Sequence, residues 1–278
     1  MGAGDGEPAV GRSIGPFKLE AVLGEGGMGV VYRAVREGSG ETVALKVLKR
    51  ALSGDDVFRR RFDREARIAG QLEHRHLVPV LEHGELDGVP YLAMRYVDGM
   101  SLDARIKDGL LPLEETIRII SEIASGLDSL HREGLVHRDV KPANVLIDGD
   151  MSASLTDYGL ARGMAYTVLT RPGEVMGTLD YLAPELISGN EASPASDVYA
   201  LGCTAYECFT GAAPCAGVSI FEVATSHIDE EPPDPREARP ELPPDLAWAL
   251  VQAMVKDPAR RPTTALAYAT MLQAAAPR

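Results

Sequence analysis

A run of glycines near the start of the chain has the spacing of a loop that binds phosphate groups. The segment Gly24-Glu25-Gly26-Gly27-Met28-Gly29 fits the pattern G-x-G-x-x-G, which is a weak signal by itself because it also opens dinucleotide-binding folds. In those folds a helix follows the glycines, whereas here the apolar residues 30–35 are typical of a strand. A glycine-rich hairpin can bring its backbone close to triphosphate oxygens because no side chains intervene. The context therefore favours a loop that covers a triphosphate.

Two residues of opposite charge stand in apolar surroundings. Lys46 lies in the segment 43–48, which is apolar on both strand faces, and a buried ammonium needs an anionic partner. Glu65 lies on the apolar stripe of the next predicted helix, where apolar residues recur at steps of three and four. We predict a Lys46–Glu65 pair, which would hold Lys46 against the nucleotide's phosphates. The alternative is a lysine at a strand edge that extends its ammonium into water.

Strands and helices must position these residues. The hydrophobic pattern predicts two parts of the chain, one rich in strands and one mainly helical. Short alternating apolar runs broken by glycine indicate antiparallel strands, accompanied by a helix at about 55–72. The later part is helical and contains a mostly apolar helix, 197–210, which is expected to be buried on nearly all sides. The other predicted segments are strands 30–35, 43–48, 78–83 and 91–96, helices 114–132, 248–255 and 264–274, and a Pro-rich loop at 232–244.

Composition excludes several classes of protein. The 278 residues are 45% hydrophobic and 25% charged, which is typical of a globular protein, and no apolar run approaches the ~20 residues that span a bilayer. The start, Met1 to Pro8, lacks the basic and apolar regions of a signal peptide. We therefore expect a cytoplasmic protein without a membrane segment in this sequence, with an anchor outside it left open. The net charge of −13 argues against nucleic acid as a partner.

The cysteines and two of the histidines do not have the spacing or the companion ligands of a metal site. Cys203, Cys208 and Cys215 are an odd number within a short stretch, and buried reduced thiols are expected rather than a disulfide or a metal site. His74 and His76 lack companion ligands and are predicted to be loop or surface residues.

A second series of motifs follows in the helical part of the chain. The motifs are His137-Arg138-Asp139-Val140-Lys141-Pro142-Ala143-Asn144, Asp157-Tyr158-Gly159, Gly177-Thr178, Ala183-Pro184-Glu185 and Ser196-Asp197-Val198-Tyr199-Ala200-Leu201-Gly202. Together with the glycine loop and Val43-Ala44-Leu45-Lys46, the series resembles the eukaryotic-like (Hanks-type) serine/threonine protein kinases, and most closely their bacterial branch. The resemblance runs from about Phe17 to about Ala274, and it is specific because all motifs occur in order.

The resemblance implies an α+β, bilobal fold, with a small antiparallel β-sheet lobe carrying one main helix and a larger, mostly α-helical lobe. Residues 1–16 would be a flexible leader and 17–274 the kinase domain, divided into an N-lobe (17–96), a hinge (95–99) and a C-lobe (100–274). The implied reaction transfers the γ-phosphate of ATP to serine and threonine hydroxyls of protein substrates, with Mg²⁺, or Mn²⁺ as an alternative. Autophosphorylation of the activation loop in trans, within a homodimer, is expected to accompany it.

The resemblance also implies chemical roles for particular residues. Asp139 would accept the substrate hydroxyl's proton or aim that hydroxyl at the γ-phosphorus, and Lys141 would neutralise charge on the transferring group. Asn144 and Asp157 would hold the metal ions as hard oxygen ligands. Lys141 is typical of serine/threonine-specific members, and Thr178 would bridge it to Asp139.

Contacts with ATP are expected along the glycine loop, on the strands behind it and in the hinge. Met94 would be the gatekeeper, and the residues after it would offer backbone groups to adenine. The expected set is Leu23, Gly24, Glu25, Gly26, Gly27, Met28, Gly29, Val31, Ala44, Lys46, Met94, Arg95, Tyr96, Val97 and Leu146.

Other residues are expected to support the structure. Glu185 and Arg261 would form an ion pair within the larger lobe, and Asp197 would anchor the backbone of the catalytic loop. Tyr158 replaces the phenylalanine usual in the family, and its ring is expected to pack in the same place because Ala69 leaves room for it.

Three arginines would form a phosphate pocket for the activation segment. Arg138, Arg162 and Arg61 would repel one another unless an anion lies between them. The candidate anions are phosphorylated Thr170, phosphorylated Thr167 and the unmodified carboxylate of Glu174, of which Thr170 is preferred.

Two other functions are alternatives for this sequence. A pseudokinase scaffold would bind nucleotide without turnover, and loss of Lys46, Asp139, Asn144 or Asp157 would indicate it, yet all four are present. A small-molecule phosphotransferase of related fold would lack Lys141 and the segment from Gly177 to Glu185 on which a peptide lies.

Overall fold

The computed structural model describes residues 9–27, 29–49, 56–86, 88–158, 179–215, 217 and 219–277. The chain divides into two compact units. The first contains the residues up to Glu73 and Val78–Val97, and the second contains His74–Leu77 and the residues from Asp98 onward. None of the helices in the described part of the chain has both the length and the apolar character needed to cross a membrane.

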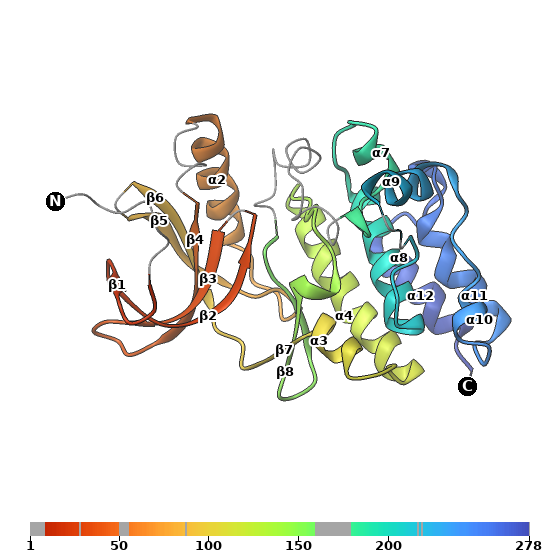
Figure 1. The fold of residues 1–278 in the computed structure, drawn as a ribbon, viewed down its shortest axis with the longest axis horizontal. Helices are drawn as coiled ribbons and strands as arrows, with labels where there is room; N and C mark the ends of the chain where they lie inside the picture. The colour runs from red at the N-terminus through yellow and green to blue at the C-terminus, as the bar shows by residue number, and fades with distance from the viewer. Residues whose placement is uncertain are drawn as a thin grey trace. The chain divides into compact units, whose positions relative to one another are not determined.

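In its described residues, the first unit is an antiparallel sheet with one helix (Figure 1). Its strands pair in the order β1-β2-β3-β4-β6-β5, so β4 lies between β3 and β6 in the interior of the sheet. Helix α2 contacts β5. The bounds are β1 Ser13–Ile14, β2 Phe17–Gly26, β3 Gly29–Arg36, β4 Thr42–Leu48, α2 Asp56–Ala69, β5 Val80–Leu86 and β6 Val89–Arg95.

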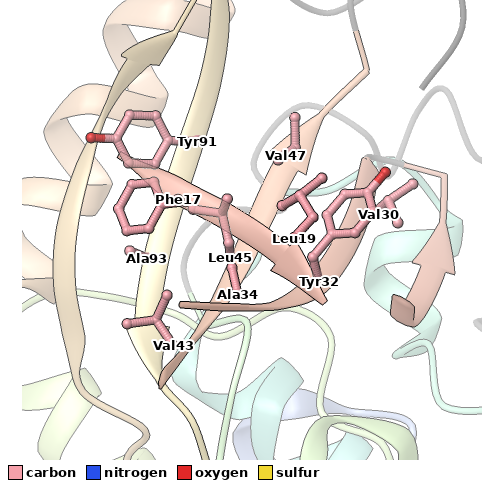
Figure 2. Close-up of a cluster of buried hydrophobic side chains, with 10 residues drawn as sticks. All are labelled: Phe17, Leu19, Val30, Tyr32, Ala34, Val43, Leu45, Val47, Tyr91 and Ala93. Carbon is pink, nitrogen blue, oxygen red and sulfur yellow. The ribbon is translucent and has the colours of Figure 1, made fainter. Parts of the chain in front are cut away.

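Alternating apolar side chains build the core of this sheet (Figure 2). In β3, Val30, Tyr32 and Ala34 are buried while Arg33 is exposed, as expected of a strand with one face against a core. The rings of Phe17 and Tyr91 meet edge-on at 5.6 Å between centroids, which is a favoured aromatic geometry. The cluster contains Phe17, Leu19, Val30, Tyr32, Ala34, Val43, Leu45, Val47, Tyr91 and Ala93. This core supports the two strands that carry the glycine loop.

The second unit is mainly helical, with a small sheet in the order β7-β8-β9. Helices α4, α11 and α12 all contact α8. The helices are α3 Leu102–Lys107, α4 Leu113–Arg132, α7 Pro184–Ile187, α8 Pro194–Thr210, α9 Ile220–Asp229, α10 Pro235–Ala238, α11 Pro244–Val251 and α12 Ala265–Ala275, with short 3₁₀ turns η1 Pro142–Asn144, η2 Gln252–Met254 and η3 Pro258–Arg260. The strands are β7 Gly99–Ser101, β8 Val145–Asp148 and β9 Ala153–Leu155.

Helix α8 is the buried centre of the second unit. A capping box at Ser193 begins it, and Gly211 ends it with a φ of 84°, a conformation that glycine adopts without strain. Almost every residue between is buried, which confirms the prediction made from its apolar sequence. Cys203, Cys208 and Cys215 are buried and free, also as predicted.

Two local predictions were wrong. Ser13–Ile14 form strand β1, paired with β2, although 1–16 was predicted to be a flexible leader. Pro235–Ala238 form a helical turn inside the predicted loop, because the Asp234 side chain accepts a hydrogen bond from the Arg236 backbone and Pro235 suits the first helical position. His76 lies in a turn between α2 and β5, in agreement with the prediction of a loop, and it is buried there with its Nδ1 2.8 Å from the backbone oxygen of Ala153.

The predicted ion pair between Glu185 and Arg261 is confirmed. Two parallel hydrogen bonds of 2.8 Å join the guanidinium to the carboxylate, and the Ser196 hydroxyl donates to the same carboxylate. Burial by itself would raise the pKa of Glu185, but the hydrogen bonds from Arg261 and Ser196 outweigh it and hold the pKa below its usual value. The guanidinium also donates to the backbone oxygens of Val255, Ala195 and Lys256. This pair connects α7, α8 and the segment before α12.

The Arg261→Ala variant is expected to lose about 3–5 kcal/mol of unfolding free energy, because the Glu185 side chain, which is 11% exposed, would lose its cationic partner. Urea unfolding followed by circular dichroism measures this. Arg236→Ala, which breaks the exposed pair with Asp234, is the control and should change stability little. Equal losses in the two variants would show that the buried pair is no more important than a surface contact.

Candidate active site

The predicted catalytic loop, residues 137–144, is bonded to a buried carboxylate. The two side-chain oxygens of Asp197 accept hydrogen bonds of 2.8 Å from the backbone N–H groups of His137 and Arg138. Arg138 has a φ of 70°, which costs energy in a residue with a Cβ and persists when the surroundings enforce it. The predicted anchoring by Asp197 is confirmed.

Asp139, Lys141 and Asn144 meet in one polar group within this loop. The Lys141 ammonium lies 2.9 Å from Oδ1 of Asp139. The Asn144 amide nitrogen donates to Oδ2 of Asp139 at 2.8 Å and to the Asp139 backbone oxygen at 2.7 Å. Each oxygen of the Asp139 carboxylate therefore has its own donor, and the carboxylate is held in one orientation.

The segment that carries Asp157 is tied to the same loop. The Thr156 backbone N–H donates to the Asn144 backbone oxygen at 3.0 Å, and His137 Nε2 lies 3.1 Å from the Thr156 backbone oxygen. Burial lowers the pKa of His137 and outweighs the nearby carboxylates, so the ring is neutral and acts as a donor to Thr156. Asp157 itself has a φ of 62°. Asp157 thus adopts a left-handed backbone conformation, which is uncommon for a residue with a Cβ.

The Tyr158 ring is buried, as predicted, while its packing against Ala69 stays a prediction. The ring lies 6.4 Å from the His137 ring at 60°. Burial raises the pKa of Tyr158, so the phenol stays neutral. Ala69, which was expected to leave room for this ring, is buried in the first unit.

The chemistry of the donors in the second unit fits a divalent cation. Because the Asn144 amide nitrogen donates to Asp139, its carbonyl oxygen is directed the other way. That oxygen and the Asp157 carboxylate are hard ligands of the kind that Mg²⁺ accepts alongside water and substrate phosphates. The described residues contain no group of three or more His, Cys, Asp or Glu side chains arranged for a metal.

In the first unit the glycines lie at the end of a hairpin. Strands β2 and β3 pair up to Gly26 and Gly29, so a strand follows the glycines as expected. A Cβ added at Gly29 would lie 2.1 Å from the Val47 backbone oxygen, which explains that glycine by packing. At Gly24 and Gly26 a Cβ would meet no described atom within 4 Å. Packing does not require glycine there, and the bare backbone suits close approach of a phosphate.

Lys46 and Glu65 are both buried, with 8% and 7% of their surface exposed. Lys46 lies in β4, opposite Val31 on one side and Leu92 on the other. An interior strand excludes the alternative of a lysine at a sheet edge. The pairing of Lys46 with Glu65 stays a prediction.

The remaining residues expected to contact ATP lie at several places. In the first unit, Met94 is buried in β6 beside Ala44 of β4, and Arg95 is exposed while Tyr96 and Val97 are half-buried. Leu23 is exposed on β2, and Val31 pairs with Gly24. Leu146 is half-buried in β8 of the second unit.

Several predicted residues cannot be placed. Met28, Arg162, Thr167, Thr170, Glu174 and Thr178 lie outside the described residues, as does the side chain of Arg61. The phosphate pocket and the bridge from Thr178 to Asp139 therefore stay predictions.

Two residues near the site were not anticipated. His131 Nε2 lies 2.7 Å from Oδ2 of Asp197, and Asp128 lies one helical turn before His131. Their spacing at the end of the predicted helix 114–132 indicated a shared face, but it did not indicate that the face meets Asp197.

Comparison with known proteins agrees with this geometry. The family model described as "Protein kinase domain" matches residues 17–273. PknH, a serine/threonine-protein kinase of Mycobacterium tuberculosis, is 42% identical over 253 residues, covering 91% of this chain and 40% of PknH. PknD of the same organism is 40% identical over 259 residues, covering 92% of this chain and 39% of PknD. The chain thus spans about two fifths of the length of these curated relatives.

A solved structure agrees as well. The crystal structure of the M. tuberculosis PknI kinase domain matches with a TM-score of 0.79 at 34% identity, covering 96% of this chain and 98% of that one. Members of this family use ATP and divalent metal ions. With the family model over nearly the whole chain and relatives at this identity, the chain belongs to the protein kinase family, in its serine/threonine branch.

Proposed function

We propose that this chain is an active serine/threonine protein kinase domain that transfers the γ-phosphate of ATP to serine and threonine hydroxyls of proteins. The observation that carries the proposal is the polar group in which Lys141 and Asn144 hold the two oxygens of Asp139. Loss of Lys46, Asp139, Asn144 or Asp157 would favour a pseudokinase, and all four are present.

The reaction follows from the chemistry of that group. A bond forms between the substrate hydroxyl oxygen and the γ-phosphorus, while the bond from that phosphorus to the β–γ bridging oxygen breaks and ADP leaves. Asp139 orients the hydroxyl and accepts its proton. The Lys141 ammonium, 2.9 Å from Asp139, balances negative charge on the phosphoryl group. These are fixed charges, so they stabilise the transition state without reorganisation.

Asn144 and Asp157 are proposed to hold Mg²⁺, with Mn²⁺ as an alternative. The cation would neutralise the β- and γ-phosphate oxygens during transfer. Asn144 is suited to this because its amide orientation is set by Asp139.

The first unit is proposed to be the N-lobe (17–96), the second the C-lobe (100–274) and residues 95–99 the hinge. Lys46, paired with Glu65, would contact the phosphates under the glycine loop. The burial of both charges supports this pair, because either alone would be costly to desolvate. We also propose that the domain acts in the cytoplasm, where ATP is available, and that it autophosphorylates in trans within a homodimer.

The direct test is the Asp139→Asn variant. Its rate of autophosphorylation should fall by about 10²–10⁴-fold, because asparagine cannot accept the proton. Mass spectrometry after incubation with Mg-ATP measures the phosphate gained. Asp150→Asn, at an exposed turn, makes the same chemical change and should match wild type. Unphosphorylated wild type would favour a pseudokinase, and a fully active Asp139→Asn would remove Asp139 from the mechanism.

The Lys46→Met variant tests the N-lobe assignment. Its rate should fall by about 10²–10³-fold, since a charge that stabilises the transition state is lost. Glu65→Gln should share the defect in part. Lys18→Met, at an exposed position of β2, is the control. Nearly normal activity in Lys46→Met would contradict the proposed pair.

The activation segment is tested by substitution of its candidate anions. Thr170→Ala should lower activity by about tenfold or more, because one to three charge-assisted hydrogen bonds to the arginines are lost, whereas Glu174→Gln should lower it slightly. The phosphorylated threonine should map to 167–170. Full activity in the Thr167→Ala/Thr170→Ala double variant, lost on adding Glu174→Gln, would identify the carboxylate as the anion.

A further inference from the structure

The carboxylate of Asp197 has a third donor besides the catalytic loop. His131, near the end of α4, places Nε2 at 2.7 Å from Oδ2, the oxygen that also accepts from the His137 backbone. Because a carboxylate oxygen accepts, His131 must carry its proton on Nε2. The two side chains are 10% and 1% exposed, so this contact is largely shielded from water.

The other side of His131 faces a second carboxylate. Its Nδ1 lies 3.9 Å from Oδ1 of Asp128, which is within the range of an ion pair when the ring is protonated but too long for a hydrogen bond. Asp128 in turn accepts from the backbone N–H groups of Ala265 at 2.9 Å and Leu266 at 3.2 Å. These are the first residues of α12, where a negative charge is favourable.

We propose that Asp128 and His131 are positioning residues, which connect the start of α12 to the catalytic loop through Asp197. A hydrogen bond joins the Ala265 backbone to Asp128, and Asp128 approaches His131 at 3.9 Å. Hydrogen bonds then join His131 to Asp197, and Asp197 to the backbone of His137 and Arg138. The kinetic consequence rests on the proposed kinase function, whereas the structural connection does not.

The catalytic loop is sensitive to such a connection for a physical reason. Arg138 is held at a φ of 70°, and Asp139 follows it directly, so the backbone bond to Asp197 helps to set the direction of the Asp139 side chain. If His131 is removed, Asp197 keeps its buried charge but loses a donor, which weakens its hold on the loop. Small displacements of a positioned group reduce the rate of transfer.

The experiment combines hydrogen exchange with kinetics on the whole domain. In His131→Leu, the amides of His137 and Arg138 should exchange about tenfold faster relative to those of α8, and kcat should fall about tenfold while the KM for ATP is unchanged. His131→Gln, which can offer an N–H close to the Nε2 position, should restore both within about threefold. Asp128→Ala should speed exchange at His137 and Arg138 although it does not touch them.

Tyr268→Phe is the matched control. It removes a hydrogen bond between α12 and the Leu250 backbone oxygen without changing a member of the chain of contacts, and its exchange at His137 and Arg138 should stay at the wild-type value. Wild-type exchange in His131→Leu would overturn the proposal, and so would equal acceleration in Tyr268→Phe, or failure of His131→Gln to rescue. An inactive wild-type domain would refute the proposed function, while the exchange data would still decide whether the connection exists.

Discussion

The buried carboxylate of Asp197 is the interaction on which the rest of the site depends. A charge that is 1% exposed is expensive to desolvate unless donors surround it, and here they are two backbone N–H groups of the catalytic loop and the ring of His131. The same bonds hold Arg138 in a left-handed conformation that a free loop would leave. The charge and the strained backbone therefore stabilise each other. Because Asp139 directly follows Arg138, its position depends on that backbone.

Helix α8 can supply this charge because its two ends differ in composition. Its first turn contains Ser196 and Asp197, and the helix dipole favours a carboxylate there. The rest of the helix is almost entirely buried and apolar. Ser196 donates to Glu185, so one turn of α8 contributes to both buried charge centres of the second unit. Loss of one partner from such a pair is strongly destabilising. The Glu185–Arg261 pair therefore constrains how α7 and the segment before α12 pack against α8.

Around Asp139 the arrangement is set by hydrogen bonds with little freedom. Lys141 and Asn144 take different oxygens of the carboxylate, and the Asn144 backbone is tied to Thr156, one residue before Asp157. Burial keeps His137 neutral, so the ring donates to Thr156 without adding a charge near the two aspartates. The proposed proton acceptor and the proposed metal ligands are in this way connected through short backbone segments, which is how a phosphotransfer site can be built with few catalytic side chains.

The sequence by itself determined the elements and much of the site. Periodicity identified strands β3, β4, β5 and β6 of the first unit and helices α4, α8, α11 and α12 of the second. A charge at an apolar position correctly indicated that Lys46 and Glu65 are buried. Ordered motifs identified the Asp197 anchor and the Glu185–Arg261 pair. The elements could be predicted because burial repeats with the period of an element, whereas these two contacts, between residues 60 and 76 positions apart, were implied by the resemblance of the ordered motifs to a known family.

Tertiary structure decided the rest. A two-residue strand such as β1 has no period to detect, and His76 is buried because Ala153, 77 positions away, comes to meet it. The contact of His131 with Asp197 joins residues 66 positions apart, and Asp128 meets Ala265 across 137. Local patterns indicate which face of a helix is turned inward, but the identity of the group it meets depends on the path of the whole chain, and only the folded structure contains that path.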